Sequence, residues 1–170
     1  MQIRHTAIPG PNNAAYQVSA TRYNEDHIID DTNSKIKNTP EGGVAVKLTN
    51  KTGAASVKGT LVSASTTTDN AFALQSNEFD CFGVVYEAGI ADGSACWVVV
   101  SGIAELLMKD TVAAVRGYIA ISADMDGRAT CIAVPTATPT SDTHWKEIGH
   151  LIESKTAGTS VIAKAIIHFN

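Results

Sequence analysis

The stretch Phe82-Gly83-Val84-Val85-Tyr86-Glu87 recurs in altered form as Ile148-Gly149-His150-Leu151-Ile152-Glu153. Each stretch is followed by a turn of small residues and then by an apolar run, 95–100 in the first copy and 161–166 in the second. The glycine, the glutamate and the turn serine keep the same order at one constant offset, without a gap. Such self-similarity is the sequence mark of a repeated supersecondary unit, and it predicts an internally duplicated β unit.

A second pair of segments lies upstream of these stretches. Residues 57–62 read Val-Lys-Gly-Thr-Leu-Val and resemble residues 115–120, which read Val-Arg-Gly-Tyr-Ile-Ala, although their spacing to the later strands differs. Gly83 and Gly149 stand inside strand patterns, where glycine marks a bulge or the close approach of another backbone. Because bulges bend a sheet and help to protect its edges, these glycines predict a strongly curved β body.

Most of the chain after Gly43 consists of short β-branched runs between Gly, Asp, Asn and Thr. The predicted strands are Val44–Leu48, Gly59–Ala64, Phe82–Tyr86, Cys96–Val100, Tyr118–Ile121, Thr130–Val134, Ile148–Glu153 and Val161–Phe169. Residues 102–108 fit either one or two helical turns or a continuing strand, and residues 158–160 fit a hairpin turn. Short strands at this spacing favour an all-β fold, a small curved β-sandwich or barrel-like body.

Residues 1–42 differ in texture from the rest of the chain. They are polar and irregular, with breakers such as Pro9-Gly10-Pro11 and Glu41-Gly42-Gly43. We therefore predict an extended N-terminal arm over residues 1–42 and a β-rich body over residues 43–170.

The composition excludes several function classes. The 170 residues are 44% hydrophobic and 18% charged, against an average charged share of about 25%. A net charge of -4 and a pI near 5.7 argue against nucleic-acid binding and against electrostatic attachment to an anionic membrane. The start of the chain lacks the basic-then-apolar pattern of a secretory signal. The three cysteines are an odd number without a CxxC pair; they fit reduced, buried thiols, and a disulfide between two of them stays open.

No pattern of residues in the sequence indicates a catalytic site or a metal site. The histidines, namely His5, His27, His144, His150 and His168, are scattered, and the two in predicted strands fit paired or interfacial roles better than metal ligation. Glu87 and Glu153 could suggest a glycosidase pair, but they hold equivalent places in the two repeats, which explains them without catalysis. We expect no catalytic residue, no metal site and no cofactor.

The order of several features is similar to that of a known family. It runs through Gly59, Phe82-Gly83-Val84-Val85, Val98-Val99-Val100-Ser101-Gly102, Val115-Arg116-Gly117, Asp126-Gly127, the stretch 147–153, and the closing Ile166-Ile167-His168-Phe169. In this order, residues 43–170 resemble bacteriophage capsid-decoration (head cement) and capsid-fibre proteins. Residues 18–29 are similar to a short segment common in phage fibre and appendage proteins, with Tyr23 where tryptophan is more usual.

The resemblance implies a non-enzymatic virion structural protein. Such a chain is made in the host cytoplasm and binds the major capsid protein on the capsid exterior, commonly as a homotrimer. The arm is then assigned to docking or trimer interlocking through Tyr16, Val18, Arg22, Tyr23, Asn24, His27, Ile28 and Ile29. Two alternatives stay open at this point: a tail-fibre or host-recognition domain that binds host glycans, and a small enzyme with an unrecognised site.

Overall fold

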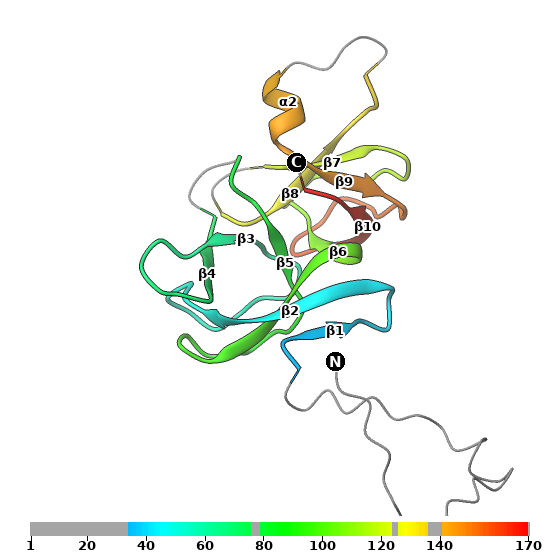
Figure 1. Cartoon of the computed structure of the whole chain (residues 1–170). Helices are drawn as coiled ribbons and strands as arrows, with labels where there is room; N and C mark the ends of the chain where they lie inside the picture. The colour runs from blue at the N-terminus through cyan, green and yellow to red at the C-terminus, as the bar shows by residue number, and fades with distance from the viewer. Residues whose placement is uncertain (1–33, 76–78, 124–125, 136–140, 170) are drawn as a thin grey trace, which may run out of the picture. The chain divides into compact units, whose positions relative to one another are not determined.

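The computed structural model describes residues 34–75, 79–123, 126–135 and 141–169, and these residues form an all-β body, as predicted (Figure 1). The strands are β1 Ile36–Asn38, β2 Gly43–Asn50, β3 Leu61–Ala64, β4 Ala71–Leu74, β5 Gly83–Val85, β6 Ala95–Leu107, β7 Ile119–Ser122, β8 Ala129–Ile132, β9 Glu147–Leu151 and β10 Ile162–Ile167. A short helix, α2, covers Ser141–Trp145. Every predicted strand overlaps an observed one, whereas β1, β4 and α2 were not predicted.

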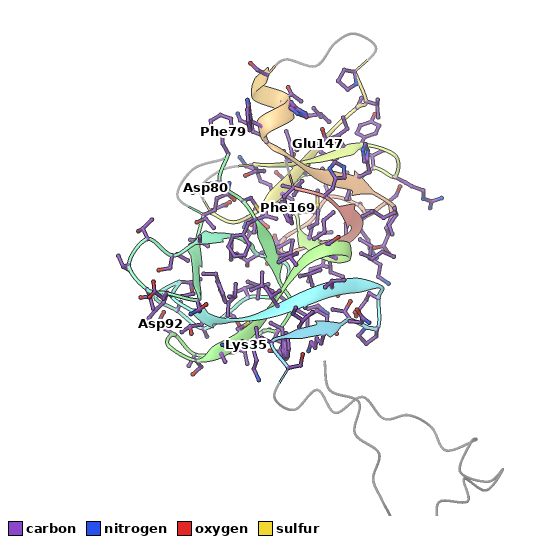
Figure 2. All side chains as sticks on the ribbon, viewed as in Figure 1. Lys35, Phe79, Asp80, Asp92, Glu147 and Phe169 are labelled. Carbon is purple, nitrogen blue, oxygen red and sulfur yellow. The ribbon has the colours of Figure 1, made fainter. Side chains whose placement is uncertain are left out.

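The strands close into two small rings that share β6. The sheet order is β1-β2-β4-β3-β5-β6-β10-β9-β7-β8, and β6 pairs a second time with β2, so β2, β4, β3, β5 and β6 form a closed barrel. On the other side, a parallel bridge from Met108 to Ala129 joins the end of β6 to β8. The barrel-like prediction is thus confirmed, and the 13-residue β6 is a continuing strand through Gly102. Asp92 of the first barrel and Glu147 of the second lie toward opposite ends of the body (Figure 2).

The pairing of β3 with β5 and of β7 with β9 agrees with the predicted duplication, whereas the last pairing differs by one residue: Val84 lies opposite Val99, but its counterpart His150 lies opposite Ile166. Val62 of β3 lies opposite Gly83 of β5, and Ala120 of β7 lies opposite Gly149 of β9. These are the positions that the sequence repeats align. Each of β3 and β7 also pairs on its other side with the strand that follows it in sequence, β4 or β8. The second strand set therefore repeats the first, with β6 ending the first copy and starting the second.

Backbone hydrogen bonds repeat as well. The Gly59 N–H donates to the Val85 carbonyl at 2.8 Å, and the Gly117 N–H donates to the Leu151 carbonyl at 2.8 Å. Both glycines have a left-handed backbone, with φ of +86° and +83°. Each is the third residue of a tight turn closed by an i→i+3 hydrogen bond, a position where positive φ favours glycine.

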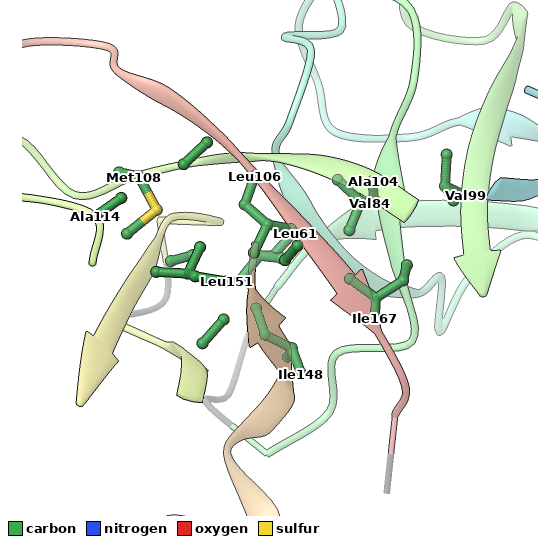
Figure 3. Packing of buried hydrophobic residues seen from close by; sticks show 14 of the residues in the cluster. Leu61, Val84, Val99, Ala104, Leu106, Met108, Ala114, Ile148, Leu151 and Ile167 are labelled. Atoms are coloured by element: carbon green, nitrogen blue, oxygen red, sulfur yellow. The ribbon is translucent and has the colours of Figure 1, made fainter. Parts of the chain in front are cut away.

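The core runs through both barrels. Its larger cluster includes Leu61 from the first barrel, Leu106 from the shared strand, and Ile148, Leu151 and Ile167 from the second (Figure 3). A smaller cluster packs inside the first barrel around Phe72. The three cysteines are free thiols, with Cys96 buried and Cys81 and Cys131 partly buried.

The compact unit that the structure describes begins at Ile36, within the range predicted as an arm. Strand β1 pairs with β2 from Ile36 to Asn38. Residues 1–33 lie outside the described residues, so the extended arm stays a prediction. No helix among the described residues is long and apolar enough to cross a membrane.

Candidate functional site

Three polar side chains with metal-ligand chemistry meet on the second barrel. Glu147 begins β9, His150 lies within it, and His168 directly follows β10. The Nε2 atoms of His150 and His168 are each 3.5 Å from Oε1 of Glu147, and the two imidazole ring centres are 5.5 Å apart. We call Glu147, His150 and His168 the histidine–glutamate cluster.

A β-bulge places two of these residues on the same face of the sheet. In a regular strand, residues three apart point to opposite faces, because side chains alternate. Here Ala120 lies opposite Gly149 while Ile121 lies opposite Glu147, which leaves Ile148 without a partner in β7. The extra residue resets the alternation, so Glu147 and His150 point to the same side.

Gly149 makes this bulge sterically feasible. Its φ is +148°, and a Cβ at this position would overlap the carbonyl oxygen of Ile166 on β10. Side chains rarely adopt this backbone conformation, and β10 could not approach so closely past a side chain. The prediction that Gly149 marks a bulge or a close backbone approach is therefore confirmed in both senses.

The third member of the cluster is placed by β10. Ile166 lies opposite His150, and residues directly opposite each other share a face. His168 is two residues further along, so it returns to that same face. Its N–H donates to the Ile148 carbonyl at 3.0 Å, which fixes its backbone beside the bulge.

The cluster is accessible from solvent. The side chains of His150 and His168 are 48% and 47% exposed, and that of Glu147 is 16% exposed. His144 of α2 approaches from the side, with Nδ1 4.0 Å from Oε2 of Glu147. One carboxylate and two imidazoles at this spacing can ion-pair or bind a divalent cation.

Exposed apolar side chains lie close to the cluster. Ile166, directly opposite His150 and two residues before His168, is 48% exposed, and Trp145, two residues before Glu147, is 58% exposed. Phe79 is also exposed, and the Nζ atom of Lys146 lies 5.2 Å from its ring centre. Figure 2 shows Phe79 and Glu147 toward the end of the body that carries α2. We call Phe79, Trp145 and Ile166, together with the histidine–glutamate cluster, the α2-end surface.

A second polar group attaches β1 to the first barrel. Lys37 Nζ lies 4.7 Å from the ring centre of Tyr86 and 4.6 Å from that of Trp97. Lys58 also lies over Tyr86 and forms an ion pair with Glu105, whose hydrogen bond raises the pKa of Lys58. Burial raises the pKa of Tyr86. These contacts join β1 to side chains of the first barrel, so this group fits a structural role.

Glu87 and Glu153, the pair that could suggest a glycosidase, accept hydrogen bonds from backbone N–H groups. Glu87 Oε2 accepts the Trp97 N–H at 3.4 Å, and Glu153 Oε2 accepts the Lys164 N–H at 3.1 Å. Both bonds hold the last strand of a repeat, although the donor in the second copy lies one residue beyond the position equivalent to Trp97. This agrees with the interpretation of the pair as a product of duplication.

The docking residues predicted from the sequence all belong to the N-terminal arm. Tyr16, Val18, Arg22, Tyr23, Asn24, His27, Ile28 and Ile29 all lie outside the described residues, and their docking role stays a prediction. Sequence reasoning considered His150 and His168 but did not bring them together, and it did not single out Glu147. The one available signal was Gly149, because a bulge predicted there changes which side chains share a face.

The geometry defines an all-β protein made of duplicated small barrels, with a candidate binding site on an outer sheet face. No family model matches the chain, and no curated protein matches it. Among solved structures, it is similar to the N base of the head fibre gp8.5 in bacteriophage phi29, with a TM-score of 0.49 and 12% identity. The match covers 73% of this chain and 92% of the fibre base. A likeness of this size carries no argument about function.

Proposed function

We propose that this chain is a non-enzymatic virion structural protein that binds the outer surface of a phage capsid. In this role it acts as a decoration (cement) or head-fibre subunit and assembles as a homotrimer. The observation that carries the proposal is the α2-end surface, where large apolar side chains are exposed on the β body. The capsid as partner follows from the sequence resemblance of residues 43–170.

Several exposed apolar side chains lie near the histidine–glutamate cluster in sequence or in register. Single exposed apolar residues are normal, whereas contiguous ones mark interaction sites. Trp145 and Ile166 flank the histidine–glutamate cluster in sequence or in register, and Lys146 links Phe79 to the same end. A low charged share of 18% also suits a chain whose surface meets other proteins.

The proposal gives the arm and the body separate tasks. The arm, through the residues Tyr16 to Ile29, docks or interlocks, since a segment that orders on binding can cover a large surface at an entropic cost. The body supplies the trimer contacts and the display surface. Repeated sites on an icosahedral shell would then raise avidity without any new chemistry.

Co-sedimentation with shells of the cognate major capsid protein that lack decoration tests the proposal. We expect the full-length chain to pellet with the shells and light scattering to give the mass of a trimer. Deletion of residues 1–35, which leaves β1 and the compact unit intact, is expected to abolish pelleting. Full retention after this deletion would contradict the assignment of the arm to docking.

A matched pair of surface variants tests the α2-end surface. Trp145→Ser and Ile166→Ser together should weaken either trimerisation or capsid binding, whereas Val57→Ser, an exposed apolar residue of the first barrel, should change neither. If the full-length chain does not bind the shells but binds host cells, the capsid proposal is overturned and a host-recognition domain is favoured.

A further inference from the structure

We propose that Glu147, His150 and His168 bind a divalent transition-metal ion of the Zn²⁺ type. The ligand atoms are Oε1 of Glu147 and Nε2 of each histidine, and one ligand atom from each of the three residues lies within 4.8 Å of the others. The site goes beyond the proposed virion role and does not depend on it.

The spacing of these atoms fits a single ion. With metal–ligand distances of about 2.1 Å and tetrahedral angles, two ligand atoms lie about 3.4 Å apart. The carboxylate oxygen is 3.5 Å from each Nε2, so both carboxylate–imidazole distances already have this value. Both histidine side chains are about half exposed, which leaves room for the small rotations that complete the site.

The donor set selects the class of ion. Imidazole nitrogen suits zinc, copper, iron and nickel, whereas calcium and magnesium take oxygen ligands almost exclusively. Two imidazoles and one carboxylate are a known zinc donor set that leaves a coordination position open for water. Since the cluster faces solvent, that position is accessible in the free chain.

Duplication does not explain why these residues occur together. At the offset that relates the two copies, Glu147 corresponds to Cys81 and His150 corresponds to Val84, so the equivalent positions of the first barrel do not repeat the cluster. By contrast, Glu153 does have its counterpart in Glu87, with the same backbone role. The ligand residues are thus additions to the second barrel, placed where the bulge at Gly149 turns Glu147 and His150 to one side.

The ion would connect two parts of the second barrel. Glu147 and His150 belong to β9, and His168 follows β10 near the end of the described chain. A shared ion would therefore hold residues 168–169 against β9, in addition to the hydrogen bond from the His168 N–H to Ile148. Zn²⁺ should accordingly stabilise the folded chain as well as bind it, because it binds the folded state alone.

The experiment is a calorimetric titration of the metal-free, full-length chain with Zn²⁺, alongside absorption spectra with Co²⁺ as a coloured substitute. We expect one ion per chain, a rise in melting temperature, and Co²⁺ bands typical of low coordination number. His150→Ala, His168→Ala and Glu147→Gln should each weaken Zn²⁺ binding at least about 100-fold, because even partners that only support metal ligands change affinity by 10- to 100-fold.

Ile166→Ala is the matched control, because it changes the exposed residue directly opposite His150 and keeps all three ligands. It should bind Zn²⁺ as the parent chain does. Circular dichroism of each variant verifies that the barrels remain folded. We expect them to, because the side chains of both histidines are about half exposed. Zn²⁺ binding that is equal in the parent and in folded ligand variants would overturn the proposal, as would absence of stoichiometric binding to the parent chain.

Discussion

The two turn glycines of the duplicated unit provide a controlled experiment within one chain. Gly59 and Gly117 occupy equivalent turns, with φ of +86° and +83°, so alanine at either position experiences the same backbone strain. Their surroundings differ. A Cβ at position 59 would lie 2.7 Å from the Leu107 nitrogen and 3.0 Å from the Glu105 carbonyl oxygen, whereas a Cβ at position 117 meets nothing within 4 Å.

The magnitudes follow from these two terms. A left-handed backbone costs a non-glycine residue about 1–2 kcal/mol, so Gly117→Ala should reduce the free energy of unfolding by that amount. Gly59→Ala adds steric overlap with the backbone of β6, for which overpacking costs of about 1–3 kcal/mol are typical. That backbone cannot easily move away, because the Leu107 N–H donates to the Gly59 carbonyl at 2.8 Å. We expect a total of about 2–5 kcal/mol for Gly59→Ala.

Equilibrium urea unfolding of both variants, followed by circular dichroism, measures the difference. The midpoint for Gly59→Ala should be the lower of the two, with unchanged slopes, since the slope reports the surface exposed on unfolding. Equal losses in the two variants would refute the reasoning, because they would mean that the contact with β6 contributes nothing beyond the strain of the turn.

Three further predictions concern single side chains. Lys37→Ala removes the Lys37 contact with the Trp97 ring at 4.6 Å and should lower the free energy of unfolding in urea by about 1 kcal/mol. The second prediction concerns Glu153, whose hydrogen bond with Lys155 lowers its pKa below the ordinary 4.5. This contribution is therefore present above pH 4.5 and is lost as the pH falls through the lowered pKa, so Glu153→Gln should reduce the melting temperature at neutral pH but not at about pH 3. Burial raises the pKa of Cys81 to about 12, so iodoacetamide should modify this thiol about a thousandfold more slowly in the folded chain than in urea at pH 8.

Specific outcomes would contradict each of these. Lys35→Ala is the control for Lys37, and equal stability losses in both would argue against the cation–π contact. A Glu153→Gln deficit that persists at about pH 3 would show that the variant disturbs packing rather than charge. Rapid modification of Cys81 in the folded chain, located by mass spectrometry, would contradict the raised pKa of this thiol.

Repetition made the fold predictable from sequence. A single short apolar run is a weak signal, but two runs that share a glycine, a glutamate and a turn at constant spacing support each other. Strand β4, Ala71–Leu74, was missed because it is short, contains two alanines and follows polar residues. Strand β1 was missed because Ile36–Asn38 has only one apolar residue, and its position depends on pairing with β2 and on the Lys37 contacts with distant rings.

The histidine–glutamate cluster depends on information that spacing alone does not carry. Simple alternation along β9 puts Glu147 and His150 on opposite faces, so the sequence argues against their meeting. The bulge reverses this result, and its exact residue is set by the register between β7 and β9. His168 joins only because β10 returns antiparallel beside β9. The cluster thus depends on the bulge, on the register between β7 and β9, and on the pairing of β10 with β9. Each of these is set by strand pairing and not by the sequence spacing of the three residues.

Duplication also helps to separate residues that build the fold from residues that add to it. A position needed by the barrel should keep its role in both copies, and this holds for Gly59 with Gly117 and for Glu87 with Glu153. His150 instead faces solvent where its counterpart, Val84, is fully buried, so the barrel itself does not require a histidine there. Exposed residues that differ between structurally equivalent positions are those free to be selected for binding, which is why the second barrel, rather than the first, carries the candidate site.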